Sequence, residues 1–186
     1  DGSRVVLREG NGTYDLSVLL LGNDRRTEPL VRTAFSELNA EISPDGRWLA
    51  YESNESGQRE IYVRSFPNVS GGRWQVSGGG GTRPLWARNG QELFYMTTSG
   101  ADSTLMTVRI QPGAAWSAGT PTELFSGRFY FTETGIGEGR TYDASPDGQR
   151  FLMIKDAGGS DQAAARTNLV VVQNWFEELK RLVPAK

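Results

Sequence analysis

The feature that most constrains this chain is a turn-forming dipeptide that occurs four times at the same distance before an apolar residue. Asp-Gly or Asn-Gly stands at residues 1–2, 45–46, 89–90 and 147–148. The first three are 44 residues apart and the last interval is 58, so the third unit carries 14 extra residues. Four positions after each Asp or Asn comes an apolar side chain: Val5, Leu49, Leu93 and Phe151. This period is typical of an array of small repeated structural units.

Each unit contains short runs of β-branched and aromatic residues, bounded by Gly, Asn, Asp or Pro, which predicts β-strands. Residues 47–51 and 92–96 are apolar on both alternating faces, so these strands must be covered on both sides. Further strands are expected before the turn (39–43, 83–87, 141–145) and after the first strand (14–21, 60–66, 105–110, 168–172).

Four-stranded units of this length, covered on both faces, predict an all-β fold of the β-propeller type. We expect about four blades of antiparallel sheet within residues 1–173. These are a partial blade at 1–37, a blade at 38–82, a blade with the insertion at 83–139 and a partial blade at 140–173. The innermost strand of the first blade would precede Asp1, so the chain is expected to be the C-terminal portion of a larger propeller. Closing the array requires further blades or a second copy of the chain, which would form a homodimer.

A short amphipathic helix is expected at residues 174–183. Asn174 suits the N-cap and Glu177 the capping box, while Trp175, Leu179 and Leu182 share one face. Packing of this face on the last blade is the favoured interpretation, and docking to another domain or subunit is the alternative.

The Ser-Pro-Asp-Gly turns themselves favour a structural role. Pro sets φ at the second position, Asp bonds nearby backbone and Gly adopts positive φ, which closes a hairpin. Asp45 or Asp147 would alternatively be a ligand carboxylate. Asn89, which forms turns equally well without a charge, supports the structural interpretation.

Composition excludes several kinds of function. The chain has neither Cys nor His, which removes thiolate nucleophiles, the usual general base of a catalytic triad and the commonest metal ligands. We therefore expect no enzyme activity, no cofactor and no metal. The 20 basic and 22 acidic residues form no like-charged run, so neither nucleic acid nor an anionic membrane is an expected partner. No apolar run is long enough to span a bilayer.

Two groups of residues are candidates for binding. The segment 127–143 is rich in aromatics and Arg, the residues that dominate interaction surfaces, and its candidate contacts are Arg128, Tyr130, Arg140 and Tyr142. In the alternative interpretation, Phe129 and Phe131 extend a strand and pack inwards. The second group lies on the innermost strands, where residues are expected to line the rim of a central channel: Asn39, Arg83, Trp86, Arg140 and Tyr142.

The stretch SPDGRWLAYESNESGQREIYVRSFP (43–67) resembles the TolB-type, WD-like repeat of bacterial β-propellers. The resemblance covers residues 1 to about 172. YDASPDGQRFLMIK (142–155) and NLVVVQNWFEELKRLVP (168–184) resemble more narrowly the C-terminal end of propellers attached to bacterial serine/threonine protein kinases. The third unit departs from the pattern, with WARNG in place of Ser-Pro-Asp-Gly. This departure and the insertion affect local loops and turns and leave the predicted fold unchanged.

The resemblance implies a propeller of six to eight blades, located outside the cytoplasm, most simply in the periplasm. It also implies a non-enzymatic module that binds a protein or small ligand on its rim, as the sensor or scaffold part of a larger bacterial protein. The alternative is the substrate-gating propeller of a prolyl oligopeptidase-like peptidase whose catalytic domain lies outside this chain.

Overall fold

The computed structural model describes residues 2–99, 102–130 and 139–154, and these residues form thirteen β-strands joined by turns and loops. No helix occurs among them. The expected helix at 174–183, the expected strand at 168–172 and Phe131 all lie outside the described residues, so these three remain predictions. No helix in the described part of the chain is long and apolar enough to cross a membrane.

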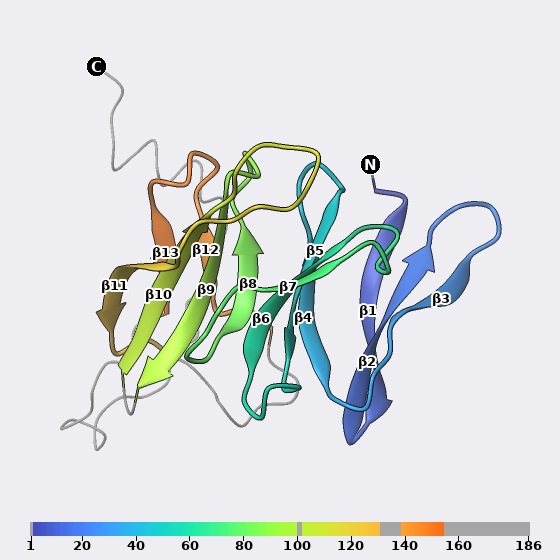
Figure 1. Ribbon diagram of the computed structural model, residues 1–186, viewed down its shortest axis with the longest axis horizontal. Helices are drawn as coiled ribbons and strands as arrows, with labels where there is room; N and C mark the ends of the chain where they lie inside the picture. The colour runs from blue at the N-terminus through green and yellow to red at the C-terminus, as the bar shows by residue number, and fades with distance from the viewer. Residues whose placement is uncertain (1, 100–101, 131–138, 155–186) are drawn as a thin grey trace, which may run out of the picture. The chain divides into compact units, whose positions relative to one another are not determined.

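The strands form antiparallel sheets that follow one another in chain order (Figure 1). Blade 1 contains β1 (Arg4–Asn11), β2 (Thr13–Leu20) and β3 (Arg26–Val31). Blade 2 contains β4 (Glu37–Ile42), β5 (Trp48–Ser53), β6 (Glu60–Ser65) and β7 (Arg73–Gln75). Blade 3 contains β8 (Thr82–Trp86), β9 (Glu92–Ser99), β10 (Asp102–Arg109) and β11 (Thr122–Gly127). Blade 4 is represented by β12 (Tyr142–Ala144) and β13 (Phe151–Met153). The prediction of an all-β chain with four-stranded antiparallel sheets is confirmed.

The repeated dipeptide forms the turn between the first two strands of blades 2, 3 and 4. Gly46, Gly90 and Gly148 have φ of 70°, 70° and 69°, and each donates its N–H over 2.8 Å to the carbonyl three residues earlier. Asp45 Oδ1 accepts hydrogen bonds from Ser43 Oγ (2.5 Å) and from the N–H of Arg47 (3.1 Å). Asp45 therefore holds the turn together.

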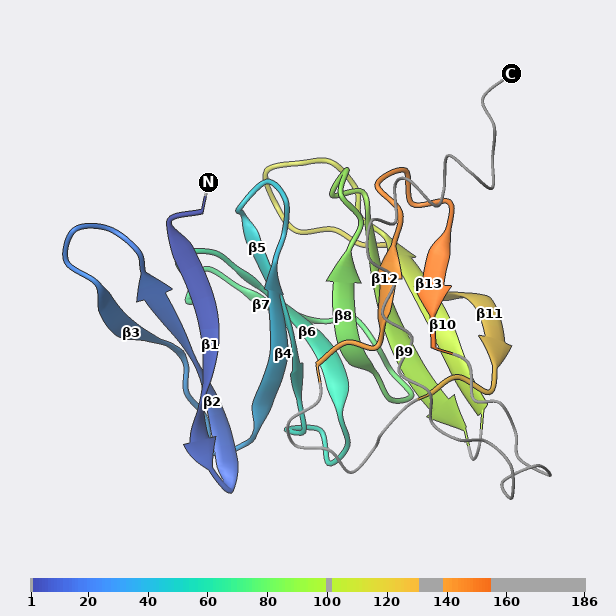
Figure 2. The same cartoon turned by 180° about the vertical axis from the view of Figure 1, so that it is seen from behind.

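The sheets of blades 2 and 3 bury apolar side chains on both faces, as the continuous apolar runs predict. Along β5, Leu49 and Tyr51 pack with side chains of blade 1, whereas Trp48 and Ala50 pack with those of blade 3. Contacts between β4 and β8, and between β5 and β8, bring blades 2 and 3 side by side, as both faces of the molecule show (Figures 1 and 2). The core consists of the layers between neighbouring sheets.

A cluster of four tryptophans fills the layer between blades 2 and 3. Trp48 lies 5.7 Å from Trp74 and 5.3 Å from Trp116, and Trp86 lies 6.1 Å from Trp116, measured between ring centroids. Trp116 comes from a loop after β10 that folds back through a bridge between Ile110 and Ala118. The guanidinium of Arg47 donates to the carbonyls of residues 113 and 114 (2.8 and 2.9 Å), which fixes this loop on blade 2.

The positive φ of Gly46 predicts that replacing this glycine lowers the stability of the fold. We expect Gly46→Ala to lower the free energy of unfolding by about 1 kcal/mol, because an added Cβ is strained at φ of 70° although no atom lies within 4 Å of it. Gly79→Ala is the matched control, since Gly79 also has open space around its Cβ position but no positive φ. Urea denaturation measures both, and equal effects would contradict the prediction.

Candidate functional site

The candidate site lies on the innermost strands β4, β8 and β12, and begins with a shared backbone irregularity. Asn39 and Arg83 stand six residues before their turns and have φ of 48° and 54°, in the left-handed region. The pairing register shifts at both places, between Leu38 and Glu41 and between Thr82 and Leu85. For Arg83 this conformation costs about 1 kcal/mol, so the surroundings must stabilise it.

Glu52, at the end of β5, provides that stabilisation. Its side chain is 1% exposed. Oε1 accepts hydrogen bonds from Asn39 Nδ2 (2.6 Å), Thr82 Oγ1 (2.7 Å) and the backbone N–H of Arg83 (2.5 Å). Arg59 Nη1 lies 3.5 Å from Oε2. This Glu52 network joins blade 2 to the start of blade 3 and holds both irregular backbones in place.

Tyr142 extends the contact to blade 4. Its hydroxyl donates to the carbonyl of Arg83 over 2.7 Å, and the ring is buried in the layer between blades 3 and 4. Burial raises the pKa of the Tyr142 phenol well above its ordinary value. The phenol therefore stays protonated, as its role as a donor requires.

Glu41 and Arg140 form an ion pair between β4 and the residue that leads into β12. Arg140 Nη1 lies 3.2 Å from Glu41 Oε2, and 31% and 29% of the two side chains are exposed. Arg140 also donates from Nε to the carbonyl of Tyr142 (3.1 Å) and from Nη1 to that of Pro84 (3.4 Å). Burial raises the pKa of Glu41, and the charge of Arg140 partly opposes that rise. The pair therefore contacts three blades and remains open to solvent.

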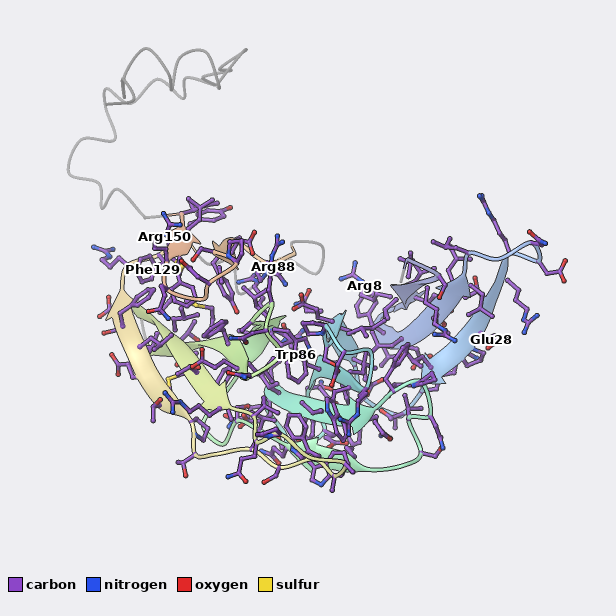
Figure 3. The ribbon with its side chains drawn as sticks, turned by 90° about the horizontal axis from the view of Figure 1, so that it is seen from above. Arg8, Glu28, Trp86, Arg88, Phe129 and Arg150 are labelled. Carbon is purple, nitrogen blue, oxygen red and sulfur yellow. The ribbon has the colours of Figure 1, made fainter. Side chains whose placement is uncertain are left out.

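Trp86 lies beneath this pair. Its N–H donates to Glu41 Oε2 (3.2 Å) and its indole Nε1 donates to the carbonyl of Glu41 (3.1 Å). The side chain is 4% exposed and packs between the sheets, where Figure 3 shows it. Trp86 thus supports the site from within, and its ring is not available on the surface.

Of the seven residues singled out from the sequence, the structure brings five together. Two glutamates connect them: Glu52 binds Asn39 and Arg83, Arg83 binds Tyr142, and Glu41 binds Trp86 and Arg140. Asn39 is half-buried and Arg83 is buried, so Arg140 is the most accessible member.

The other two candidates, Arg128 and Tyr130, follow β11 and are exposed. Tyr130 accepts a hydrogen bond from Thr141 Oγ1 at its carbonyl and donates its N–H to the carbonyl of Ile154. Phe129, next to it, packs on Phe125 at 5.7 Å between ring centroids. Phe129 therefore packs inwards, whereas Tyr130 is 44% exposed.

Glu41 and Glu52 were not among the sequence-derived candidates. Glu52 has no counterpart in the repeat, because the equivalent position of blade 3 is Met96. The sequence does contain a signal for Glu52, because this charged residue lies in a strand that is otherwise apolar on both faces. A buried charge requires partners. Glu37 and Glu60 are also 1% exposed, and burial raises the pKa of Glu37.

The site offers hydrogen-bonding and charged groups rather than reactive ones. Within the described residues, no group of three or more acidic side chains could hold a metal ion. The exposed part is an acid and a base held at fixed positions on the innermost strands. This arrangement suits recognition of a ligand that carries complementary polar groups.

The comparisons with known proteins agree with the fold. TolB from Acinetobacter baumannii is matched with a TM-score of 0.60 and 21% identity, over 85% of this chain and 36% of that one. A protein assigned as TolB from Agrobacterium tumefaciens is matched with a TM-score of 0.57 and 15% identity, over 68% of this chain and 46% of that one. A puromycin-hydrolysing peptidase from Mycobacterium tuberculosis is matched with a TM-score of 0.49 and 14% identity, over 68% and 23% of the two chains, which is too weak to carry an argument. No protein-family model and no curated protein matches the sequence.

The fold is therefore that of a TolB-like β-propeller, of which this chain forms a part. The chain spans less than half of the length of either TolB structure. At these identities the likeness defines the fold, and the role of the chain is a separate question.

The Glu52 network predicts a large loss of stability when it is removed. We expect Glu52→Ala to lower the free energy of unfolding by about 3 kcal/mol, because the buried N–H of Arg83 and the half-buried side chains of Asn39 and Thr82 lose their acceptor. Glu28→Ala is the control. Glu28 is 45% exposed in its ion pair with Arg26 on the outer strand of blade 1 (Figure 3), and its loss should cost less than about 0.5 kcal/mol. Similar losses in both variants by urea denaturation would contradict the structural role of Glu52.

Proposed function

We propose that this chain is a binding module, without catalysis of its own, that holds a protein or small ligand on the innermost strands of the propeller. The observation that carries the proposal is the Glu41–Arg140 ion pair. Contacts from three blades hold this pair in place, and about a third of each side chain is exposed, so a ligand can reach both charges. The absence of Cys and His from the sequence supports a role in binding.

The surroundings of the pair support recognition with a defined geometry. Backbone carbonyls of blades 3 and 4 fix the guanidinium of Arg140, and the N–H of Trp86 fixes the carboxylate of Glu41. A ligand that binds here meets groups that are already in position, so little conformational entropy is lost on binding. An extended peptide with adjacent acidic and basic side chains is the chemistry that matches the pair most directly.

The wider setting of the module is also a proposal. We infer that the chain is the sensor or scaffold part of a larger bacterial protein outside the cytoplasm, and that this protein is a serine/threonine kinase. The inference rests on the TolB-type repeat and on the sequence of residues 142–155 and 168–184. The share of the TolB structures that the chain covers is consistent with its being one part of a longer propeller.

A binding experiment with random peptides tests the site. Peptides of twelve residues, displayed on phage and selected on the immobilised chain, are expected to lose at least about tenfold in affinity for Arg140→Gln, which corresponds to about 1.4 kcal/mol. Arg150→Gln is the matched control, because Arg150 is exposed and lies on the turn of blade 4 (Figure 3). Tyr130→Ala, in the same assay, tests whether the segment after β11 also contributes.

Three outcomes separate the interpretations. Loss of binding in Arg140→Gln with unchanged melting temperature supports the proposal, and equal loss in both arginine variants contradicts it. A drop in stability without loss of binding for Tyr130→Ala would show that Tyr130 packs rather than binds.

Exposed apolar side chains on the two terminal sheets predict self-association. Val5 and Leu21 of blade 1 are 41% and 38% exposed, and Leu152 and Ile154 of blade 4 are 75% and 53% exposed. We propose that a second copy covers these faces, so sedimentation velocity is expected to show a dimer or larger species. Leu152→Glu should weaken association, whereas Leu124→Glu on β11 should not. A stable monomer at tens of micromolar would argue against this proposal.

A further inference from the structure

A cleft lies between blades 2 and 3, at the end of their shared seam where the repeated turns are found. Its volume is about 240 Å³, and three segments line it: 45–48 in blade 2, 89–91 in blade 3 and the loop 110–113 after β10. Figure 1 shows this loop in yellow beside the turn between β4 and β5. Blades 2 and 3 have four strands each, so this turn-side cleft is complete without any further blade.

Hydrogen bonds hold the walls of the turn-side cleft in place. Ile110 donates its N–H to the carbonyl of Gln91 over 2.8 Å, which ties the loop to the turn of blade 3. The guanidinium of Arg47 donates to the carbonyls of residues 113 and 114, which ties the same loop to blade 2. The cleft is therefore formed before a ligand arrives, and such preorganisation lowers the entropic cost of binding.

The turn of blade 3 differs from the turn of blade 2 in charge and not in geometry. Asn89 and Gln91 stand where blade 2 has Asp45 and Arg47. Asn89 Oδ1 accepts the N–H of Gln91 over 2.9 Å. The same bond in blade 2, accepted by Asp45 Oδ1, is 3.1 Å long. The turn of blade 3 thus uses one side-chain oxygen of Asn89, and this wall of the cleft presents neutral amides in place of an acid and a base.

The cleft consequently has hydrogen-bonding groups that the fold does not use. Within the described part of the chain, Asn89 Nδ2 and both polar atoms of the Gln91 side chain make no hydrogen bond. Gln111 accepts the hydroxyl of Ser117 at Oε1 over 3.1 Å, and its Nε2 has no partner among the same residues. All three amide side chains are exposed. Each amide nitrogen can donate two hydrogen bonds, so the cleft offers several free donors beside free acceptors.

The rest of the lining is apolar or already paired. Trp48, Ile110 and Pro112 contribute apolar surface. The two charged lining residues, Asp45 and Arg47, have opposite signs, and Arg47 Nη1 lies 4.0 Å from Asp45 Oδ2. The guanidinium of Arg47 also lies 5.4 Å from the ring centroid of Trp48. These charges offset one another, so the cleft favours neither an anion nor a cation.

A neutral ligand with many hydroxyl groups matches this lining. Each hydroxyl of a sugar both donates and accepts, and neighbouring hydroxyls match the paired donor and acceptor of a primary amide. The C–H face of a sugar ring is apolar and can pack on an apolar side chain such as that of Pro112. At about 240 Å³ the cleft is smaller than the roughly 300 to 1,000 Å³ of sites for drug-sized ligands, which suits a single sugar ring.

We propose that the turn-side cleft binds one unit of a neutral saccharide. The amides of Asn89, Gln91 and Gln111 bond to its hydroxyls, and Pro112 packs on its apolar face. The cleft shares no residue with the Glu41–Arg140 ion pair, and binding here does not depend on that pair holding a ligand.

Titration of the full chain with neutral sugars tests the proposal. The probes are D-glucose, D-galactose, D-mannose and N-acetyl-D-glucosamine, added separately to the isotope-labelled chain and followed by NMR. We expect at least one of them to bind saturably with a Kd in the millimolar range. The largest shifts are expected at the side-chain amide signals of Asn89, Gln91 and Gln111.

Two glutamine variants locate the site. Gln91→Ala should weaken sugar binding at least about fivefold, because hydrogen bonds to the ligand are lost. Gln149→Ala is the matched control and should leave binding unchanged. Gln149 has the same position in the turn of blade 4, where its N–H bonds to Asp147 Oδ1 over 3.0 Å, and it does not line the cleft.

A third variant separates binding from folding. Asn89→Asp keeps the turn, since Asp45 and Asp147 form the same turn in their own blades, so the melting temperature should not change. Sugar binding should weaken, because the carboxylate lacks the donor at Nδ2.

Several outcomes would overturn the proposal. These are absence of saturable binding by all four sugars, shifts centred outside the cleft, and equal losses in Gln91→Ala and Gln149→Ala. Tighter binding of D-glucuronate or D-glucosamine than of D-glucose would show that the cleft selects a charge, against the proposal. Loss of sugar binding in Arg140→Gln would place the sugar at the inner-strand ion pair and overturn it as well.

Discussion

The arrangement of blades 2 and 3 depends on one buried carboxylate, that of Glu52. A four-stranded sheet can stack on its neighbour through apolar contacts alone, but such contacts do not fix how far one sheet slides along the other. Directional hydrogen bonds do, and Glu52 accepts two of them from Thr82 and Arg83 of blade 3, together with one from Asn39 of its own blade. The same bonds hold Arg83 in a backbone conformation that it would otherwise leave. Tyr142 and Arg140 then build on Arg83 and its neighbours.

The site follows from this constraint. Arg140 reaches Glu41 because the start of β12 lies on the carbonyls of β8, and β8 in turn is fixed by Glu52. Accessible recognition groups are thus supported by buried ones, with each blade contributing to the position of the next. Binding sites on repeat proteins commonly use the surface where successive units meet, because several units then share the cost of orienting a few side chains.

The fold could be predicted from the sequence because its signals repeat. The turn at Asp45 and Gly46 recurs in two other described blades with nearly identical φ, and the apolar residue four positions later is buried in blades 2 and 3. The site was only partly predictable because its central contacts occur once. Met96 replaces Glu52 in the next unit, so no periodic pattern marks the carboxylate. Likewise, tryptophan is a residue type that often makes contacts at binding surfaces, and only the stacking of the sheets shows that Trp86 is buried.

The four clustered tryptophans have a consequence for how this molecule can be observed. Indole emission depends strongly on the polarity around the ring and on neighbouring rings, and Trp48, Trp74, Trp86 and Trp116 all sit in the single seam where two blades touch. Any slippage, opening or loosening of that seam would admit water among the rings and separate them. The intrinsic fluorescence of these tryptophans therefore reports the separation of blades 2 and 3, without any added dye.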